Sequence, residues 1–190
     1  MSNAESPINQ NQIYKHILLA ILMYVAFFFV AIFFGFDMGS GPLFAYNHGA
    51  ENHAELSNLF YKSLLLISIA GVVLAVTAVA LSGVLARMFV GYNEHLTSLT
   101  RQAFCLFALS FALQGYNIFA SGLFTAMNNG LISASIAFLR TFAFQSLSVL
   151  TLPILFGTSG IWWSAAVAEV GALLFSGYFV LRYRRRYGYM

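Results

Sequence analysis

The sequence predicts an all-α protein that crosses a membrane five times. Its 190 residues are 60% hydrophobic and only 8% charged, whereas soluble domains are roughly 45–50% apolar and about 25% charged. Five apolar runs reach the length of about 20 residues that a bilayer span requires. None of these runs alternates apolar and polar residues over about ten positions, as strands of a membrane β-barrel do. The spans are therefore predicted to be helices.

The five spans are expected to form one transmembrane domain over residues 17–182. Residues 1–16 are polar, without the basic start and cleavage site of a signal peptide, and are predicted to be a disordered lead-in. Residues 183–190 are predicted to be a basic cytoplasmic tail. The predicted spans cover residues 17–46, 59–86, 99–127, 131–156 and 161–181.

An odd number of spans places the two termini on opposite sides of the membrane. Cytoplasmic flanks carry an excess of Lys and Arg. The flanks on the side of the C-terminus contain Lys62, Arg182, Arg184, Arg185 and Arg186, against Lys15, Arg87 and Arg101 on the other side. We therefore expect a multi-pass protein of the cell (inner) membrane with a cytoplasmic C-terminus. A basic cluster beside an apolar run indicates contact with lipid rather than with nucleic acid.

Small residues follow one face of the second span, at Gly71, Ala75, Ala78 and Ser82. Their spacing of four, three and four allows close approach of another helix. The partner helix belongs either to this chain or, if the protein associates with itself or with another protein, to a second chain.

A polar stripe runs along the third span at helical spacing. It consists of Ser110, Gln114, Asn117, Ser121 and Thr125. Polar side chains within a membrane face other helices or water. The stripe therefore either hydrogen bonds to neighbouring helices or lines a cavity, and the sequence leaves both interpretations open.

Three charged residues are predicted to lie near mid-membrane. Arg140 and Glu169 are about half-way along the fourth and fifth spans, and Asp37 is at similar depth in the first. An unpaired charge there costs on the order of 3 kcal/mol. Either Arg140 pairs with Glu169 or Asp37, or these residues and Gln145 belong to a proton, ion or substrate path. Together with Gln114 and Asn117, they are our candidate transport path or intramembrane polar network.

The first span contains residues that loosen helices, namely Gly35, Gly39, Gly41 and Pro42. We expect them to permit bending and close packing of this helix. Pro153 is a second candidate bending site, in the fourth span.

The stretch between the first two spans contains His48, Glu51, His53 and Glu55. This order differs from the His-Glu-x-x-His of zinc proteases, so we predict a solvated turn over residues 47–52 and no metal site. Ser57 or Asn58 is expected to cap the next helix. With one cysteine, no phosphate-binding loop and no serine-nucleophile motif, the sequence predicts no catalytic residues and no enzyme activity.

Three stretches resemble the multidrug and toxic compound extrusion (MATE) family. They are GFDMGSGPLFAYNHGAEN at residues 35–52, GYNIFASGLFTAMNNG at 115–130, and ISASIAFLRTFAFQSLSVLTLPILFGTSGIWWSAAVAE at 132–169. The resemblance implies helices eight to twelve of a twelve-helix fold, the second of two lobes without its first helix. It also implies an antiporter that exchanges Na⁺ or H⁺ for xenobiotics, which are small and often cationic organic compounds.

The resemblance does not extend to the family's coupling acids. The first helix of the family's fold carries one of these acids, and the 190 residues contain no counterpart of that helix. The tenth helix carries another in some members, but its equivalent here, residues 103–127, contains no Asp or Glu. We therefore expect a partial transporter that is inactive alone, without a cofactor other than a coupling ion, and completed by a second chain that supplies the missing helices. The alternatives are a stand-alone five-helix protein that self-associates or docks onto a transporter, and a fragment of a lipid-linked oligosaccharide flippase.

Overall fold

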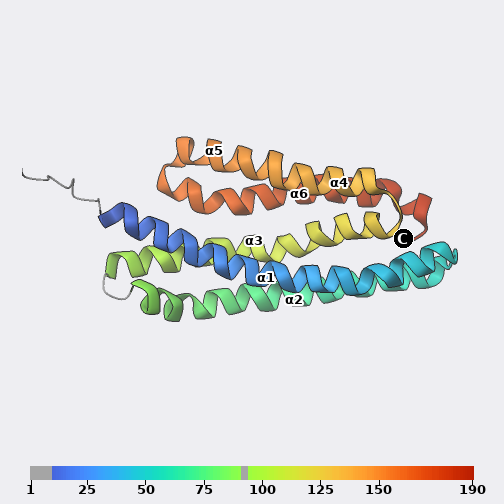
Figure 1. Cartoon of the computed structure of the whole chain (residues 1–190), viewed down its shortest axis with the longest axis horizontal. Helices are drawn as coiled ribbons and strands as arrows, with labels where there is room; N and C mark the ends of the chain where they lie inside the picture. Colours follow the sequence, from blue (N-terminus) through green and yellow to red (C-terminus); the bar gives the residue numbers. More distant parts are fainter. Residues whose placement is uncertain (1–9, 91–93) are drawn as a thin grey trace, which may run out of the picture.

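The computed structural model describes residues 10–90 and 94–190, and all of the regular secondary structure over them is helical (Figure 1). The elements are α1 (Gln10–Gly49), α2 (His53–Val90), α3 (Glu94–Ala126), α4 (Gly130–Phe138), the π-helical segment η1 (Leu139–Phe144), α5 (Gln145–Phe156) and α6 (Thr158–Tyr187). Because α4, η1 and α5 follow one another without a break, they form one rod, so the bundle has five rods.

The predicted fold class is confirmed. Five helices are long and apolar enough to cross a membrane, and they cover Ala26–Gly49, His53–Val84, Phe107–Ala126, Gly130–Phe156 and Trp163–Tyr187. Many large apolar side chains point outward on them, such as Phe28 and Leu150, each 67% exposed. Such a surface suits lipid, because water would not tolerate it on this scale.

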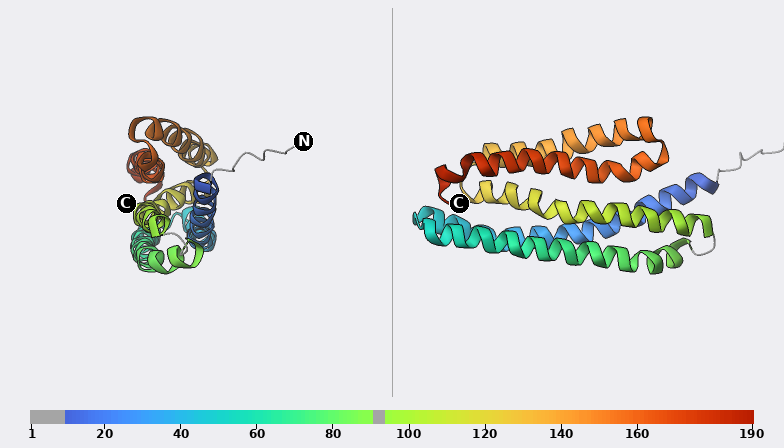
Figure 2. Two further views of the ribbon diagram at one scale, coloured as in Figure 1. Left: turned by 90° about the vertical axis from the view of Figure 1, so that its left-hand side faces the viewer. Right: turned by 180° about the vertical axis from the view of Figure 1, so that it is seen from behind.

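Successive rods run in opposite directions, and α3 lies in the middle (Figures 1 and 2). On one side of α3 lie α1 and α2, and on the other lie the α4–η1–α5 rod and α6. The chain ends at the same end of the bundle as the α1–α2 turn, opposite the end where α1 begins. The site described below lies where α3 meets its second set of neighbours.

The apolar core lies mainly between α1, α2 and α3. It includes Phe29 and Phe33 of α1, Phe60 and Ile67 of α2, and Phe111 of α3, all at most 5% exposed. The rings of Phe29 and Phe111 meet edge to face with their centres 4.7 Å apart, a favoured aromatic geometry.

The small-residue face of α2 packs against α3 of the same chain. A Cβ atom at Gly71 would lie 3.1 Å from the carbonyl oxygen of Ala112, while Ala78 and Ser82 are buried. Of the two partner helices considered for this face, the structure therefore gives the one that belongs to the same chain.

The glycines of α1 do not serve close packing among the described residues. The helix continues through Gly35, Gly39, Gly41 and Pro42 to Gly49. No neighbouring helix or side chain comes within 4 Å of where a Cβ of these glycines would stand. The expected close packing is therefore wrong for this part of the chain.

The turn between α5 and α6 does depend on glycine. Gly157 has a positive φ of 60°, a backbone conformation that other residues rarely adopt. A side chain at Gly160 would collide with the carbonyl oxygen of Leu152, one residue before Pro153. Pro153 itself lies inside α5.

Two predictions about helix ends need correction. Because α1 begins at Gln10, residues 10–16 are helical, not a disordered lead-in; residues 1–9 lie outside the described part. The α2 helix begins at His53, and the Asn52 side-chain oxygen accepts a hydrogen bond from the Glu55 backbone N–H at 3.2 Å. The capping residue is thus Asn52 and not Ser57 or Asn58.

The C-terminal residues fold back onto the bundle and do not form a free tail. After α6, Gly188 takes a positive φ of 68°, and the Tyr189 side chain is fully buried against the Phe60 ring, with ring centres 5.1 Å apart. The Tyr189 hydroxyl donates to the Val180 carbonyl at 2.7 Å. Burial, helped by the nearby Tyr187 phenol, raises the pKa of Tyr189 above its usual range.

His48 lies in the last turn of α1 and not in a solvated turn. Its ring packs edge to face against Tyr187, with ring centres 5.4 Å apart, and its Nδ1 atom is buried without a hydrogen-bond partner among the described residues. Over residues 10–90 and 94–190, no three His, Cys, Asp or Glu side chains gather as a metal site would require.

Candidate functional site

The fourth span changes from α-helix to π-helix around Arg140, the residue predicted to carry a charge near mid-membrane. Residues Leu139–Phe144 form a π-helix between α4 and α5, and Arg140 is its second residue. Short π-helical segments occur frequently at functional sites, since the wider turn re-aims side chains. Here the segment presents Arg140 to α6.

Arg140 and Glu169 form an ion pair between η1 and α6. The Arg140 Nη2 donates to Glu169 Oε1 at 2.8 Å, and Nε donates to Oε1 and Oε2 at 3.1 and 3.2 Å. The side chains are only 17% and 8% exposed. Of the two partners considered for Arg140, the structure therefore joins it to Glu169.

Asn117 of α3 completes this cluster. Its amide donates to Glu169 Oε2 at 2.7 Å and to the Glu169 carbonyl at 3.1 Å, and its side-chain oxygen accepts from the Ser176 hydroxyl at 2.8 Å. Asn117 is fully buried. Both carboxylate oxygens of Glu169 are thus hydrogen bonded, which offsets the cost of burying the charge.

A second polar cluster joins α3 to α4. The Ser121 hydroxyl donates to the Ser133 carbonyl at 3.2 Å, and the Thr125 and Ser133 hydroxyl oxygens lie 2.6 Å apart. Asn117, Ser121 and Thr125 therefore hydrogen bond between helices, one of the two interpretations of the polar stripe.

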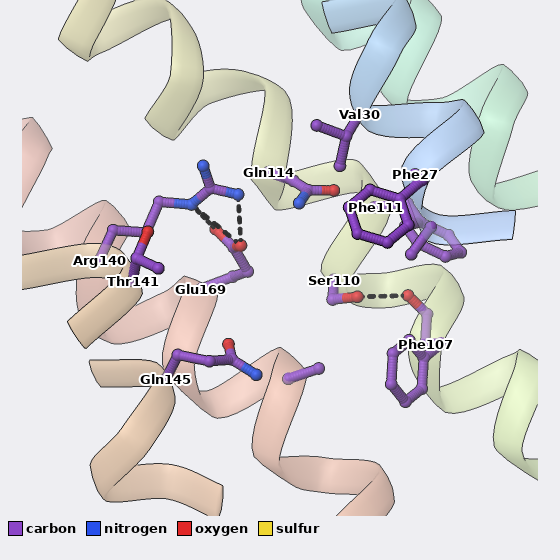
Figure 3. A pocket seen from close by; sticks show the side chains of 12 residues that line it. Phe27, Val30, Phe107, Ser110, Phe111, Gln114, Arg140, Thr141, Gln145 and Glu169 are labelled. Carbon is purple, nitrogen blue, oxygen red and sulfur yellow. Dashed lines mark hydrogen bonds and ion pairs between the residues drawn. The ribbon is translucent and has the colours of Figure 1, made fainter. Parts of the chain in front are cut away.

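The other two members of the stripe line a cavity, the alternative interpretation. Gln114 and Ser110 face a space of about 430 Å³ between α1, α3, the η1–α5 rod and α6 (Figure 3). Arg140, Gln145 and Glu169 contribute from the opposite side. The structure thus brings five of the six candidate path residues together, since Asn117 hydrogen bonds to Glu169.

Asp37, the sixth candidate, lies outside the larger cavity. Together with Asn117 and Arg140 it lines a smaller cavity of about 280 Å³, but it forms no ion pair within the described part of the chain. Its half-buried carboxylate lies directly against Gly122 of α3, where any side chain would collide with it. Asp37 is therefore not the partner of Arg140.

Sequence reasoning missed Ser133, Ser176 and Gly122. Ser176 is seven residues after Glu169, which places both on one face of a helix, so this spacing was an available signal. Ser133 follows a short turn after the polar stripe. Gly122 has no comparable signal, because its role depends on how α1 packs against α3.

A bundle of membrane-spanning helices with a buried ion pair beside a cavity is typical of membrane transport proteins. The chain matches the family MatE over residues 19–150. As this match covers more than half of the 190 residues, the protein belongs to the MatE family, and the predicted family is confirmed.

The fold is similar to that of a solved transporter. A crystal structure of the Vibrio cholerae MATE transporter VcmN in the bent form matches with a TM-score of 0.76 and 17% sequence identity. The match covers 90% of this chain and 39% of the VcmN chain, so this chain spans about two fifths of the length of that protein. A sequence comparison with curated proteins found no significant match.

Proposed function

We propose that this chain is one lobe of a MATE-type antiporter that exports small organic compounds in exchange for Na⁺ or H⁺. The observation that carries this proposal is the buried Arg140–Glu169 pair beside a cavity, within a chain of the MatE family. Membrane proteins bury charges at such cost mainly along ion and substrate paths.

The proposed lobe acts together with helices that the 190 residues do not contain. Its fold matches only 39% of the VcmN chain, so a complete transporter of that size needs further helices, on a second chain or on a longer form of this one. We expect the 190 residues alone not to transport.

Asp37 is the proposed coupling acid of this lobe. Its carboxylate accepts no hydrogen bond from the described residues, and it lies in a cavity whose other members include the hydroxyls of Ser121 and Thr125. A carboxylate without a partner in a membrane takes up a proton or a cation. Glu169, in contrast, is already neutralised by Arg140.

We also propose that the protein lies in the cell (inner) membrane with its C-terminus in the cytoplasm. Lys62 and the arginines at the end of α6 lie toward the end of the bundle where the chain ends, whereas Arg87 and Arg101 lie toward the other end. The excess of positive charge at the C-terminal end supports this orientation.

Neither alternative function gains support from a specific observation. The small-residue face of α2, which favoured a self-associating protein, is covered by α3, and no feature of the described residues favours a flippase over a drug exporter.

Co-expression tests the proposed function. The first step is to look upstream of the gene for a reading frame that encodes about seven membrane helices. In drug-sensitive cells, ethidium efflux is expected only when this chain and that partner are produced together, and Asp37→Asn should abolish it. Efflux from the 190 residues alone, or efflux from the pair that Asp37→Asn leaves intact, would contradict the proposal.

A further inference from the structure

The cavity of about 430 Å³ lies between helices from both sides of the bundle (Figure 3). Its size falls within the range of small-molecule sites. Its lining combines an aromatic wall with a few polar groups, a composition typical of sites that bind amphipathic organic molecules.

Two amides in this cavity have no protein partner. Gln114 of α3 and Gln145 at the start of α5 are half-buried, and neither side chain hydrogen bonds to another described residue. Figure 3 shows both projecting toward the space between the helices. In the interior of a membrane protein, an unsatisfied amide favours any ligand that can donate to it or accept from it.

Aromatic rings from α1 and α3 form one wall of the cavity. Phe107 and Phe111 come from α3, and Phe27 comes from α1 (Figure 3). Phe27 is 65% exposed, so its ring is free to stack on a ligand. Offset stacking and edge contacts between aromatic rings stabilise such complexes.

The charges at the cavity leave no free site for a cation. Glu169 Oε1 accepts from Arg140, and Oε2 accepts from both Arg140 and Asn117. Within the described lining, Arg140 and Glu169 are the charged residues, so their sum is zero. Arg140 is also the more exposed of the two side chains, at 17% against 8%.

We propose that this cavity binds uncharged aromatic molecules that carry an amide, with the Gln114 and Gln145 side chains as hydrogen-bond partners and the Phe27, Phe107 and Phe111 rings as the aromatic wall. The inference rests on the proposed function and deepens it, because it adds neutral compounds, held in this cavity, to the molecules that the lobe binds.

Binding of benzanilide to the whole chain in phosphatidylcholine nanodiscs tests this proposal, with empty nanodiscs to subtract partition into lipid. The matched charged probes are benzyltrimethylammonium and benzoate. We expect saturable binding of benzanilide and binding of both charged probes that is weaker by more than roughly tenfold.

Substitutions of residues that line the cavity test whether benzanilide binds there. Because each lost hydrogen bond weakens binding by roughly three- to tenfold, Gln114→Leu and Gln145→Leu should each have that effect, and the double variant should combine them. Phe27→Ala should also weaken binding, at little cost to folding because the ring is exposed. The matched control is Gln102→Leu, an exposed glutamine of α3 outside the lining, which should leave binding unchanged.

Two results would overturn the proposal. One is benzyltrimethylammonium binding as tightly as benzanilide, and the other is unchanged benzanilide affinity in both Phe27→Ala and the double variant. These results are separate from failure of the proposed function, because binding is measured without a partner chain and without transport. If the co-expressed pair exports ethidium but the cavity does not bind benzanilide, only this inference fails.

Discussion

The two faces of α3 are held to their neighbours in different ways. Toward α2 the contact consists of small and apolar groups, with Gly71 of α2 against the Ala112 backbone. Toward α6 the contact includes hydrogen bonds from Asn117 to Glu169, whose carboxylate also pairs with Arg140 of η1.

The two faces are expected to differ in how strongly a substitution destabilises them. Because lipid is as apolar as the side chains, the α2 face depends on close contact, and a change there alters packing gradually. A change on the polar face can leave a charge or an amide without a partner. Small shifts of the helices do not remove the free-energy cost of such a group. The polar face is therefore the more sensitive one, and it is also the one beside the cavity.

The largest effect is expected from Glu169→Ala, which leaves the partly buried Arg140 guanidinium unpaired. We predict a loss of about 3–5 kcal/mol in the free energy of unfolding, measured by reversible unfolding in detergent micelles followed by circular dichroism. The control Glu55→Ala removes a carboxylate near the α1–α2 turn whose hydrogen bonds are exposed, and should change the stability by about 0.5 kcal/mol or less. Equal losses in the two variants would show that the pair does not stabilise the bundle.

On the apolar face, Gly71→Val is expected to cost about 1–3 kcal/mol, because the new side chain must displace α3. The same unfolding measurement applies. Gly83→Val is the matched control, since Gly83 is on the same helix with no neighbour within 4 Å of its Cβ position. If the control costs as much as Gly71→Val, the α2–α3 contact is looser than the structure shows.

The smallest effect is expected from Ser133→Ala, which removes the hydroxyl that Ser121 and Thr125 share. Hydrogen bonds between membrane helices contribute about 0.6 kcal/mol on average, so we predict a loss near that value. Ser135→Ala removes a hydroxyl that bonds only within its own helix, to the Leu131 carbonyl, and should be close to neutral. A larger loss in Ser135→Ala would contradict the distinction between the two serines.

Much of the fold could be predicted from the sequence, because apolar length alone identifies membrane spans. The polar stripe also indicated which face of α3 meets other polar groups. The pairing of Arg140 could not be decided, since Asp37 and Glu169 were equally suitable by depth. That choice depends on the π-helical segment and on the packing of α1 against Gly122, neither of which has a sequence signal.

The helix ends were the least predictable part. Polar residues at the start of α1 and basic residues at the end of α6 resemble flexible flanks, yet the described part of both is helical. Tyr189 is buried because the Phe60 ring and the Val180 carbonyl lie next to it in space, and this proximity exists only once α2 and α6 are placed together.

A charge exchange between Arg140 and Glu169 tests the central claim most directly, namely that these two residues pair between the fourth and fifth spans. The amount of folded protein in the membrane is measured for Arg140→Glu, for Glu169→Arg and for the two combined. Each single variant places two like charges together and should sharply reduce that amount, whereas the double variant should recover much of it. A double variant no more abundant than the poorer single variant would contradict the pairing and the site built on it.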